Sequence, residues 1–498
     1  MKLRDLLHGI AVSSTEGGLD REIAAVTSDS RLVTKDALFV AIAGFQTDGA
    51  KFVDQAVAKG AAAIVVEPGA WTRGAATAPA KIEVEDARAA LAQMAASFFG
   101  RPADKLSLIG VTGTSGKTTT AKMIESIFDA TGEPVGLIGT IEYRAGDERL
   151  VADRTTPDAV VLQEWFARMA AANVRNAVME VSSHALALKR AFGVHFAAAV
   201  FTNLSRDHFD FYKDFEDYFA AKRILFDQID QSRKTAIVNI DDPYGRRIAT
   251  ELVTAAVTFG QSDKADIRPY DGFEISIRGL HGRVRTPWGD VRVQSELLGE
   301  PNLYNWLGAI GAALATGIAV GAVEEGIRSL QSVRGRFERV ATGSDGPTVI
   351  VDYAHKPDAL EKLLRAVRDL APTRRIVLLF GCGGDRDRGK RPQMGGIAGR
   401  LADYSILTSD NPRSEDPEQI LDDIEAGMQD VDAARYARIV DRRGAIADAI
   451  AAASATDVIV IAGKGHESYQ VVGDQISHFD DREEAELALK KRNEKVFT

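Results

Sequence analysis

One stretch of the chain decides the fold: Leu106-Ser-Leu-Ile-Gly110-Val-Thr-Gly113-Thr-Ser-Gly116-Lys117-Thr118-Thr119. The apolar run Leu106–Val111 predicts a buried parallel strand, and Thr118–Ala130 has the periodicity of a helix. The glycine-rich turn between them is typical of a nucleotide phosphate loop, because its N–H groups and the helix amino terminus can face an anion. Lys117 would reach the outer phosphates, and Thr118 would offer a hydroxyl to Mg²⁺. The residues assigned to the nucleotide are Gly113, Thr114, Ser115, Gly116, Lys117, Thr118 and Thr119.

Outward from this loop, short apolar runs alternate with helical patterns along the whole chain. This alternation is typical of α/β layers with mostly parallel sheets. A length of 498 residues, at about 150 residues per domain, favours three domains. A Gly/Pro break at 100–102 suggests a first domain of residues 1–102. The strand and helix pattern starts again at about residue 336, which suggests two further domains of residues 103–335 and 336–498. The strand candidates are Ala37–Ala43, Ala62–Val66, Ala177–Val181, Ala197–Phe201, Ala236–Ile240, Val349–Val351, Ile376–Phe380, Tyr404–Thr408 and Val458–Ile461.

Composition narrows the function classes. The chain has 61 Lys and Arg against 71 Asp and Glu, a net charge of −10, and 7% aromatic residues. This balance argues against nucleic-acid binding, which needs clustered cations and stacking platforms. Cys382 is the single cysteine, so no intramolecular disulfide can form, which fits a reducing cytoplasm. The uncharged stretch 306–323 is rich in Ala and Gly, and we expect a buried helix there rather than a membrane span.

Polar clusters follow two of the predicted strands of the middle block. Glu180-Val-Ser-Ser183-His184 comes after one strand, and Asn203-Leu-Ser-Arg-Asp-His208 comes after the next. Since the carboxyl ends of parallel strands share one sheet edge, both clusters should lie near the phosphate loop. A carboxylate and an imidazole there could hold metal ions that bridge phosphates. Taken singly, each histidine could equally be an ordinary hydrogen-bonded residue.

Together these motifs resemble the Mur ligase family, and the resemblance runs in order along essentially the whole chain. Further motifs that carry it are Asn302-Leu-Tyr-Asn305, Gly335-Arg336-Phe-Glu338 and Asp352-Tyr-Ala-His355. The resemblance implies a central P-loop ATPase sheet flanked by an amino-terminal nucleotide-sugar domain and a carboxyl-terminal Rossmann-like domain. It also implies an ATP-dependent, Mg²⁺-dependent amide ligase of peptidoglycan precursor synthesis.

The resemblance assigns roles at the nucleotide site. Lys117 would neutralise phosphates, Thr118 and Glu180 would hold one Mg²⁺, and His208 would help to hold a second. Lys222 matches a lysine that the family carries as a carbamate, a form that could bind metal. From the residues alone, Lys222 would be read as an exposed helix lysine. The remaining ATP residues would be Asn302, Asn305, Arg336 and Asp352.

Two further substrates are implied. For the UDP-muramoyl dipeptide, the matching residues are Ser28, Ser30, Phe45, Gln46, Thr47, Thr155, Thr156, Ser183 and Arg190. Asp410-Asn-Pro-Arg413 and Gly463-Lys-Gly-His-Glu467 resemble the family members that add meso-diaminopimelate to UDP-MurNAc-L-Ala-D-Glu through an acyl phosphate. The residues expected at diaminopimelate are Arg386, Asp410, Asn411, Pro412, Arg413, Gly463 and Glu467. Arg413 is expected to grip the distal carboxylate, because a guanidinium can make two parallel hydrogen bonds to it.

Other functions remain to be weighed against this one. On the same scaffold, the chain could add L-lysine instead, or act as a folylpolyglutamate synthase. From a different class, a P-loop ATPase could couple hydrolysis to motion or nucleic-acid binding. We expect a cytoplasmic monomer that binds small molecules and neither membrane nor nucleic acid.

Overall fold

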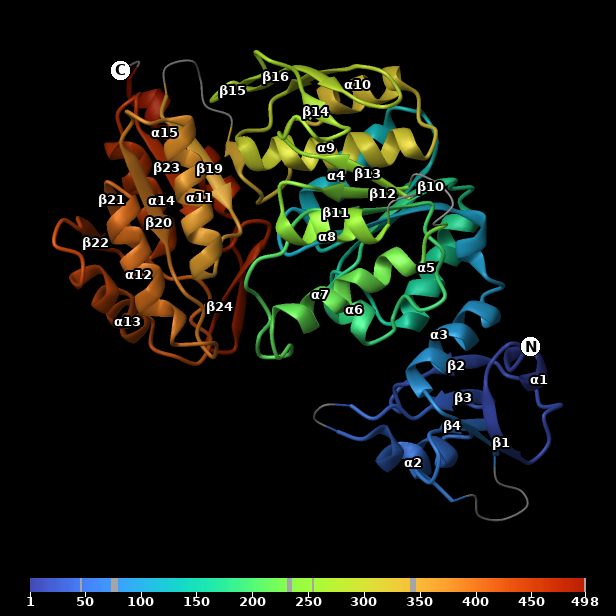
Figure 1. The fold of residues 1–498 in the computed structure, drawn as a ribbon. Coiled ribbons are helices and arrows are strands. Elements are labelled where there is room, and N and C mark those ends of the chain that lie inside the picture. Colours follow the sequence, from blue (N-terminus) through green and yellow to red (C-terminus); the bar gives the residue numbers. More distant parts are fainter. Residues whose placement is uncertain (45–46, 73–78, 231–234, 253–254, 341–345, 497–498) are drawn as a thin grey trace. The chain divides into compact units, whose positions relative to one another are not determined.

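The computed structural model describes residues 1–44, 47–72, 79–230, 235–252, 255–340 and 346–496. Its contacts divide the chain into two compact units. The first comprises Met1–Arg268 with Thr286–Gly289 and Leu307–Gly326, and the second comprises Pro269–Arg285, Asp290–Trp306 and Ile327–Thr498. Three mainly parallel sheets, one for each predicted block, form the α/β layers that the sequence predicts (Figure 1). The predicted three-domain boundaries stay a proposal.

The amino-terminal sheet has the order β1-β5-β4-β3-β2, parallel except for β1. Its inner strands β3 and β4 are buried on both faces, which explains their continuous apolar sequences. The strands are β1 (Val12–Glu16), β2 (Ala25–Thr27), β3 (Ala37–Val40), β4 (Ala63–Val66) and β5 (Ala80–Val84), and the helices are α1 (Leu3–Leu6), α2 (Val53–Ala58) and α3 (Ala87–Phe98).

The central sheet has the order β13-β12-β11-β6-β10-β7-β8-β9. Strands β13 to β7 are parallel, and β8 and β9 add an antiparallel edge. The strands are β6 (Ser107–Thr112), β7 (Val135–Ile138), β8 (Glu142–Ala145), β9 (Glu148–Val151), β10 (Asn176–Glu180), β11 (Ala198–Phe201), β12 (Ala236–Asn239) and β13 (Ala256–Phe259). The helices that follow along the chain are α4 (Lys117–Asp129), α5 (Ala159–Ala171), α6 (Ser183–Ala187), α7 (Phe215–Arg223), α8 (Pro243–Glu251), α9 (Glu300–Ala315) and α10 (Val320–Ser329).

The uncharged stretch 306–323 is not one helix. It covers the end of α9 and the beginning of α10, which are separated at Gly317, a residue with φ of +90°. Small residues on α9 allow close packing, since a side chain at Gly311 would lie 2.6 Å from Ile267 and 2.9 Å from Ile237. The expectation of a buried, small-residue helix is therefore confirmed for α9 alone. Within the described ranges, no helix is both long and apolar enough to cross a membrane.

The carboxyl-terminal sheet has the order β18-β19-β23-β20-β21-β22, parallel except for β18. Strand β23 lies at its centre and is fully buried, as its unbroken apolar sequence predicts. A separate hairpin, β24 with β25, follows it. The strands are β18 (Glu338–Val340), β19 (Thr348–Asp352), β20 (Ile376–Phe380), β21 (Tyr404–Leu407), β22 (Tyr436–Arg438), β23 (Val458–Ala462), β24 (Tyr469–Val472) and β25 (Gln475–His478). The helices are α11 (Pro357–Leu370), α12 (Lys390–Leu401), α13 (Pro417–Gln429), α14 (Arg442–Ala452) and α15 (Asp481–Val496).

A small antiparallel sheet lies between the last two blocks in sequence. Its strands are β14 (Arg268–Pro269), β15 (Glu274–Ser276), β16 (Gly279–Arg285) and β17 (Val291–Ser295), with β16 pairing with the others. The strand positions predicted from apolar runs are confirmed to within a few residues in the parallel sheets. The antiparallel edge strands and hairpins were not predicted, because their sequences are short and mostly exposed.

Candidate active site

The phosphate loop joins β6 to α4, as predicted. Gly116 has φ of +86° and caps α4, and Lys117 is the first residue of that helix. Lys117 Nζ donates to the carbonyls of Gly113 (2.9 Å) and Thr114 (3.0 Å), so its ammonium lies over the loop. Gly113 is required by close packing, because a Cβ there would lie 1.9 Å from Thr202 Oγ1. The turn can therefore pack this closely against Thr202 only with glycine at position 113.

Glu180 ends β10, beside β6, and lies against the phosphate loop. Its side chain is 1% exposed, and its Oε2 accepts a hydrogen bond from Thr118 Oγ1 at 2.9 Å. Its Oε1 accepts from the N–H of Thr140 at 2.7 Å. The structure therefore brings together the two residues that the sequence assigns to one Mg²⁺, and adds Thr140 to them.

His184 and His208 also meet, at the sheet edge where both clusters are expected, although their direct contact was not predicted. Their ring centroids are 4.6 Å apart in an edge-to-face arrangement. His208 has φ of +58°, an unfavourable backbone conformation for a residue with a side chain, and its ring lies 3.4 Å from Asp207. Burial lowers the pKa of His184 below 6.5, although Asp210 opposes this. A neutral imidazole can act as a metal ligand or a hydrogen-bond acceptor.

Lys222 is buried in α7, and the interpretation of an exposed lysine is wrong. Its side chain is 1% exposed, and its Nζ donates to Gly113 O at 2.7 Å and lies 4.4 Å from the Tyr218 ring centre. Burial, followed by the positive charge of Lys117, holds the pKa of Lys222 well below 10.5. A neutral amine is the form that can react with CO₂, so this environment suits a carbamate.

The residues assigned to the dipeptide lie along the same edge. Thr155 Oγ1 lies 3.0 Å from Thr140 Oγ1, and Thr156 Oγ1 donates to Glu180 O at 2.8 Å. Arg190 Nη1 donates to Thr156 O at 3.0 Å, and Ser183 is buried at the beginning of α6. Thr156 therefore contacts the backbone carbonyl of Glu180. Thr155 is linked through Thr140 to the Glu180 carboxylate, which the phosphate-loop residue Thr118 also contacts.

The amino-terminal residues assigned to the nucleotide sugar follow β2 and β3. Ser28 is exposed directly after β2, and Thr47 is exposed after β3. Ser30 is buried, and its hydroxyl donates to Gln55 Oε1 at 2.9 Å, which favours a structural role. Phe45 and Gln46 lie outside the described residues.

The remaining residues assigned to ATP belong to the second compact unit. On α9, Asn302 Nδ2 donates to Leu298 O at 2.8 Å, and Asn305 Nδ2 donates to Asn302 Oδ1 at 3.1 Å. Asp352, at the end of β19, accepts from the N–H groups of Phe337 (2.7 Å) and Ala354 (2.8 Å). Burial raises the pKa of Asp352, and Arg336 opposes this.

Arg336 lies over a ring at this end of the sheet. Its guanidinium carbon is 4.8 Å from the Tyr353 ring centre. The segments around it pack closely, because a Cβ at Gly335 would lie 2.1 Å from the backbone nitrogen of His466. The Gly335-Arg336 motif is therefore held directly against the Gly463–Glu467 motif.

The residues assigned to diaminopimelate gather at the carboxyl ends of β20, β21 and β23. Asn411 Nδ2 donates to Glu467 Oε2 at 3.0 Å, and Lys464 Nζ donates to Asn411 Oδ1 at 3.1 Å. Arg413 Nη1 donates to Gly384 O at 2.8 Å, while Arg386 is exposed two residues after Gly384. Of the rest of this set, Pro412 is buried, and a Cβ at Gly463 would lie 2.8 Å from Asp410 Oδ2.

Comparison with known proteins agrees with this geometry. Family models match residues 22–99 (Mur ligase family, catalytic domain), 111–313 (Mur ligase middle domain) and 335–465 (Mur ligase, glutamate ligase domain). A protein of Gloeobacter violaceus named UDP-N-acetylmuramoyl-L-alanyl-D-glutamate--2,6-diaminopimelate ligase is 46% identical, with 99% of each chain covered. The chain belongs to the Mur ligase family.

Further relatives and solved structures are similar to this chain. A protein of the same name from Geobacter metallireducens is 42% identical over 99% of each chain. A solved structure titled as this ligase has a TM-score of 0.71 and 32% identity over 99% of both chains. A folylpolyglutamate synthase structure from Mycobacterium tuberculosis, at 19% identity, a TM-score of 0.55 and 74% of this chain, shares the fold only.

The donor set of this Mur ligase fits Mg²⁺. Thr118 and Glu180 offer a hydroxyl and a carboxylate oxygen 2.9 Å apart, and hard oxygen ligands are those that Mg²⁺ prefers. Among the residues that the structure describes, no group of three or more His, Cys, Asp or Glu side chains could hold a metal by itself. Mg²⁺ commonly completes its coordination with substrate phosphates and water, so two protein ligands are an ordinary number for this ion.

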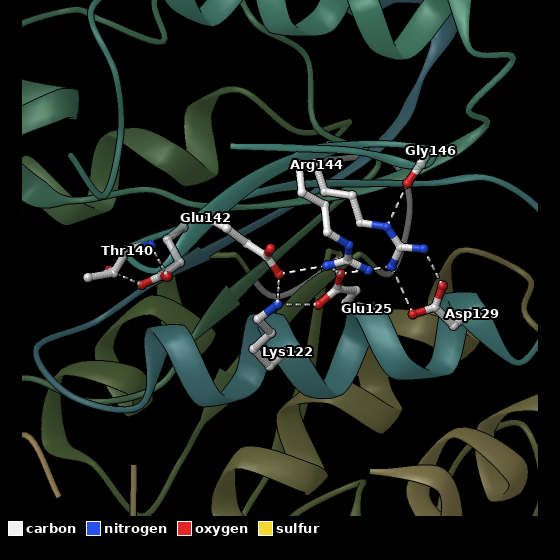
Figure 2. A network of polar contacts seen from close by, with 9 residues as sticks. Lys122, Glu125, Asp129, Thr140, Glu142, Arg144 and Gly146 are labelled. Atoms are coloured by element: carbon white, nitrogen blue, oxygen red, sulfur yellow. Dashed lines mark hydrogen bonds and ion pairs between the residues drawn. The ribbon is translucent and has the colours of Figure 1, made fainter. Parts of the chain in front are cut away.

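An ionic network fixes the phosphate-loop helix to the edge of the central sheet (Figure 2). Arg144 on β8 donates to Glu125 (2.8 Å) and to Asp129 (2.8 and 2.9 Å) on α4. Lys122 Nζ contacts Glu125 at 2.7 Å and Glu142 at 2.5 Å. Burial would raise the pKa of Glu125, but Lys122 and Arg144 outweigh it and hold this pKa below 4.5.

Sequence reasoning missed three residues of this Mur ligase that the structure places at the sites: Thr140, Lys464 and Arg442. Thr140 follows β7, a four-residue strand that we did not predict. We expect site residues among the polar residues that follow a predicted strand, so Thr140 is not among the candidates. Lys464 lies inside the Gly463–Glu467 motif and could have been assigned from it. Arg442 begins α14 and resembles any helix-end arginine, so no sequence signal identifies it.

Proposed function

We propose that this Mur ligase is the meso-diaminopimelate-adding enzyme, which joins diaminopimelate to UDP-MurNAc-L-Ala-D-Glu and converts ATP to ADP and phosphate. The observation that carries the proposal is that Arg413 and the hydrogen-bonded cluster of Asn411, Lys464 and Glu467 gather at one sheet edge, where Arg413 is oriented by the Gly384 carbonyl. A second, independent support is that the full-length relatives at 42% and 46% identity carry the name of this ligase.

The first chemical step activates a carboxylate. An oxygen of the D-glutamate carboxylate attacks the γ-phosphorus of ATP, the bond to the β–γ bridging oxygen breaks, and ADP leaves. Because two anions must meet, the phosphate loop has to offset negative charge. Lys117 supplies an ammonium over the loop, and bound Mg²⁺ would supply further positive charge beside Thr118 and Glu180.

The second step forms the amide. The neutral amine of diaminopimelate attacks the acyl carbon, the tetrahedral intermediate expels phosphate, and the amine loses its proton. Thr155, Thr156, Ser183 and Arg190 would hold the dipeptide near the loop, since Thr156 contacts Glu180 directly, Arg190 contacts Thr156, and Thr155 contacts Thr140. His184 is a candidate to accept a proton, because burial favours its neutral form.

Recognition of diaminopimelate requires opposite charges at fixed positions. Its distal carbon carries both a carboxylate and an ammonium, whereas lysine lacks that carboxylate. Arg413 would bind the carboxylate, with Arg386 in support, and Glu467 would accept from the ammonium. Asn411 and Lys464 fix the Glu467 carboxylate, so its position does not depend on the substrate.

The remaining expectations belong to the same proposal. The amino-terminal residues Ser28, Ser30 and Thr47 would lie near the uridine end, with Phe45 and Gln46. Lys222 would be a carbamate and join His208 at a second Mg²⁺. We also propose that the enzyme is a monomer and that it works in the cytoplasm, where ATP is available.

The test is amide formation with UDP-MurNAc-L-Ala-D-Glu and ATP, comparing meso-diaminopimelate with L-lysine. We expect Arg413→Ala to lower kcat/KM for diaminopimelate by roughly 150-fold, since a charge-assisted pair contributes about 3 kcal/mol. ATP binding should be unchanged. Arg365→Ala is the matched control, because Arg365 lies exposed on α11 and pairs only with Glu361 of the same helix among the contacts found. Near-normal turnover of Arg413→Ala with diaminopimelate would show that the specificity assignment is wrong.

A further inference from the structure

We infer that Thr140 is a positioning residue of the ATP-metal site, where its hydroxyl and N–H hold the Glu180 carboxylate in its metal-binding orientation. This inference rests on the proposed function only in taking Glu180 as a ligand of Mg²⁺. Nothing in the sequence singled out Thr140, and its role follows from three short contacts.

Thr140 contacts both oxygens of the carboxylate. Its N–H donates to Glu180 Oε1 at 2.7 Å, and its hydroxyl donates to Oε2 at 3.1 Å. Oε2 also accepts from Thr118 Oγ1, the second proposed ligand. With both oxygens held, the carboxylate cannot rotate without losing hydrogen bonds in a buried place, which is costly.

The backbone around Thr140 is shaped for this contact. A Cβ on Gly139 would lie 2.8 Å from Glu180 Oε1, so a larger residue there would push the carboxylate away from this position. Gly139 N–H donates to Glu142 O at 3.1 Å, which closes a turn between β7 and β8. The turn therefore presents the Thr140 N–H and hydroxyl to one side chain.

The same turn is tied to the phosphate-loop helix. Glu142, two residues after Thr140, contacts Lys122 of α4 at 2.5 Å, and Figure 2 shows Thr140 at one end of this network. Arg149 also contacts Glu142, at 2.7 Å. Since α4 begins at the phosphate loop and contains Thr118, this network connects the turn that carries Thr140 to the helix that carries Thr118.

The direction of the hydrogen bonds of the Thr140 hydroxyl also links Thr140 to the residues proposed to bind the dipeptide. A hydroxyl has a single proton, and the proton of Thr140 is directed to Glu180. Its contact with Thr155 Oγ1 at 3.0 Å must then be accepted from Thr155, a proposed dipeptide residue. The Thr140 hydroxyl oxygen therefore contacts both Glu180, a proposed metal ligand, and Thr155, a proposed dipeptide residue.

Metal affinity tests the inference without relying on catalysis. We would titrate Mn²⁺ into the full-length enzyme with one equivalent of a non-hydrolysable ATP analogue and follow free Mn²⁺ by electron paramagnetic resonance. Thr140→Val should weaken Mn²⁺ binding by roughly tenfold, the lower end for loss of an outer partner of a metal ligand. Thr140→Ser, which keeps the hydroxyl, should bind Mn²⁺ like the wild type.

Controls separate a positioning role from a structural one. Thr131→Val makes the same change just after α4, where Thr131 Oγ1 donates only to Phe128 O among the contacts found, and should leave Mn²⁺ affinity unchanged. Thr140→Ala removes the hydroxyl without a second methyl group, and it replaces Thr140→Val if that variant does not fold. Wild-type affinity in the hydroxyl-free variants, or equal loss in Thr140→Ser, would overturn the inference. If the wild type itself binds no Mn²⁺ with the analogue, the proposed function fails instead.

Discussion

Arg442 offers a sharp test, because it joins the two loops assigned to diaminopimelate through a fully buried ion pair. Its Nε and Nη2 donate to the two carboxylate oxygens of Asp481, each at 2.7 Å, and both side chains are 0% exposed. Its Nη1 donates to Ser409 O at 3.3 Å, and its Nη2 to Ala462 O at 3.0 Å. These carbonyls immediately precede Asp410 and Gly463. Replacing Arg442 by Met should therefore loosen both loops at once.

The expected loss of stability follows from the burial. Removing one partner of a buried ion pair leaves the other charge without compensation, at a cost of about 3–5 kcal/mol. For a folding unit of about 150–250 residues, each kcal/mol lowers Tm by roughly 2–4 °C. We therefore expect Arg442→Met to lower the Tm of the carboxyl-terminal unit by roughly 6–20 °C. Where the protein stays folded, the KM for diaminopimelate should rise more than the KM for ATP.

Scanning calorimetry of a double-mutant cycle measures this. Asp481→Leu alone should destabilise the protein. The double variant Arg442→Met with Asp481→Leu should lose less stability than the sum of the losses in the two single variants, because the double variant leaves no charge unpaired. Arg443→Met is the matched control, since Arg443 is 57% exposed and its pair with Glu484 should contribute about 0–1 kcal/mol. A Tm for Arg442→Met within 2 °C of the control, or additive losses in the cycle, would refute the reasoning.

Two titrating groups give further predictions. The pKa of Lys222 is depressed on folding, so the unfolded state binds the extra proton near pH 7 and folding carries a penalty that fades as pH rises. Lys222→Met should raise Tm at pH 7 in CO₂-free buffer while abolishing ligase activity, and an unchanged or lower Tm would contradict this. The hydrogen bonds from Arg391 hold the pKa of Glu415 at about 2. The stability that this pair contributes should be lost as pH falls from about 4.5 to 2, and acid unfolding of Glu415→Gln, followed by circular dichroism, should show a flatter dependence over that range.

The parallel sheets and the phosphate-loop site could be predicted from the sequence because their signals are local. Strands such as β20 and β23 are buried on both faces, so they read as unbroken apolar runs, and the residues that follow them share one edge. This rule placed the cluster that begins at Glu180 near the phosphate loop, and in the structure Glu180 contacts Thr118 of that loop. The pairing of His184 with His208 depends on how α6 and the loop after β11 pack, which no local pattern encodes.

The sequence also could not say which cations serve a substrate. Arg391 lies five residues after Arg386 and looks equivalent in sequence, yet it is fully buried between Glu415 and Asp423, so its charge is already balanced by the protein. Arg413, in contrast, donates to the neutral carbonyl of Gly384, which orients the guanidinium without neutralising it. Net charge and motif position do not reveal this difference, because it depends on which groups each guanidinium contacts after folding. An acidic chain of net charge −10 can therefore bind the three proposed substrates, each of which carries carboxylates or phosphates, provided that a few cations are oriented by carbonyls rather than paired with carboxylates.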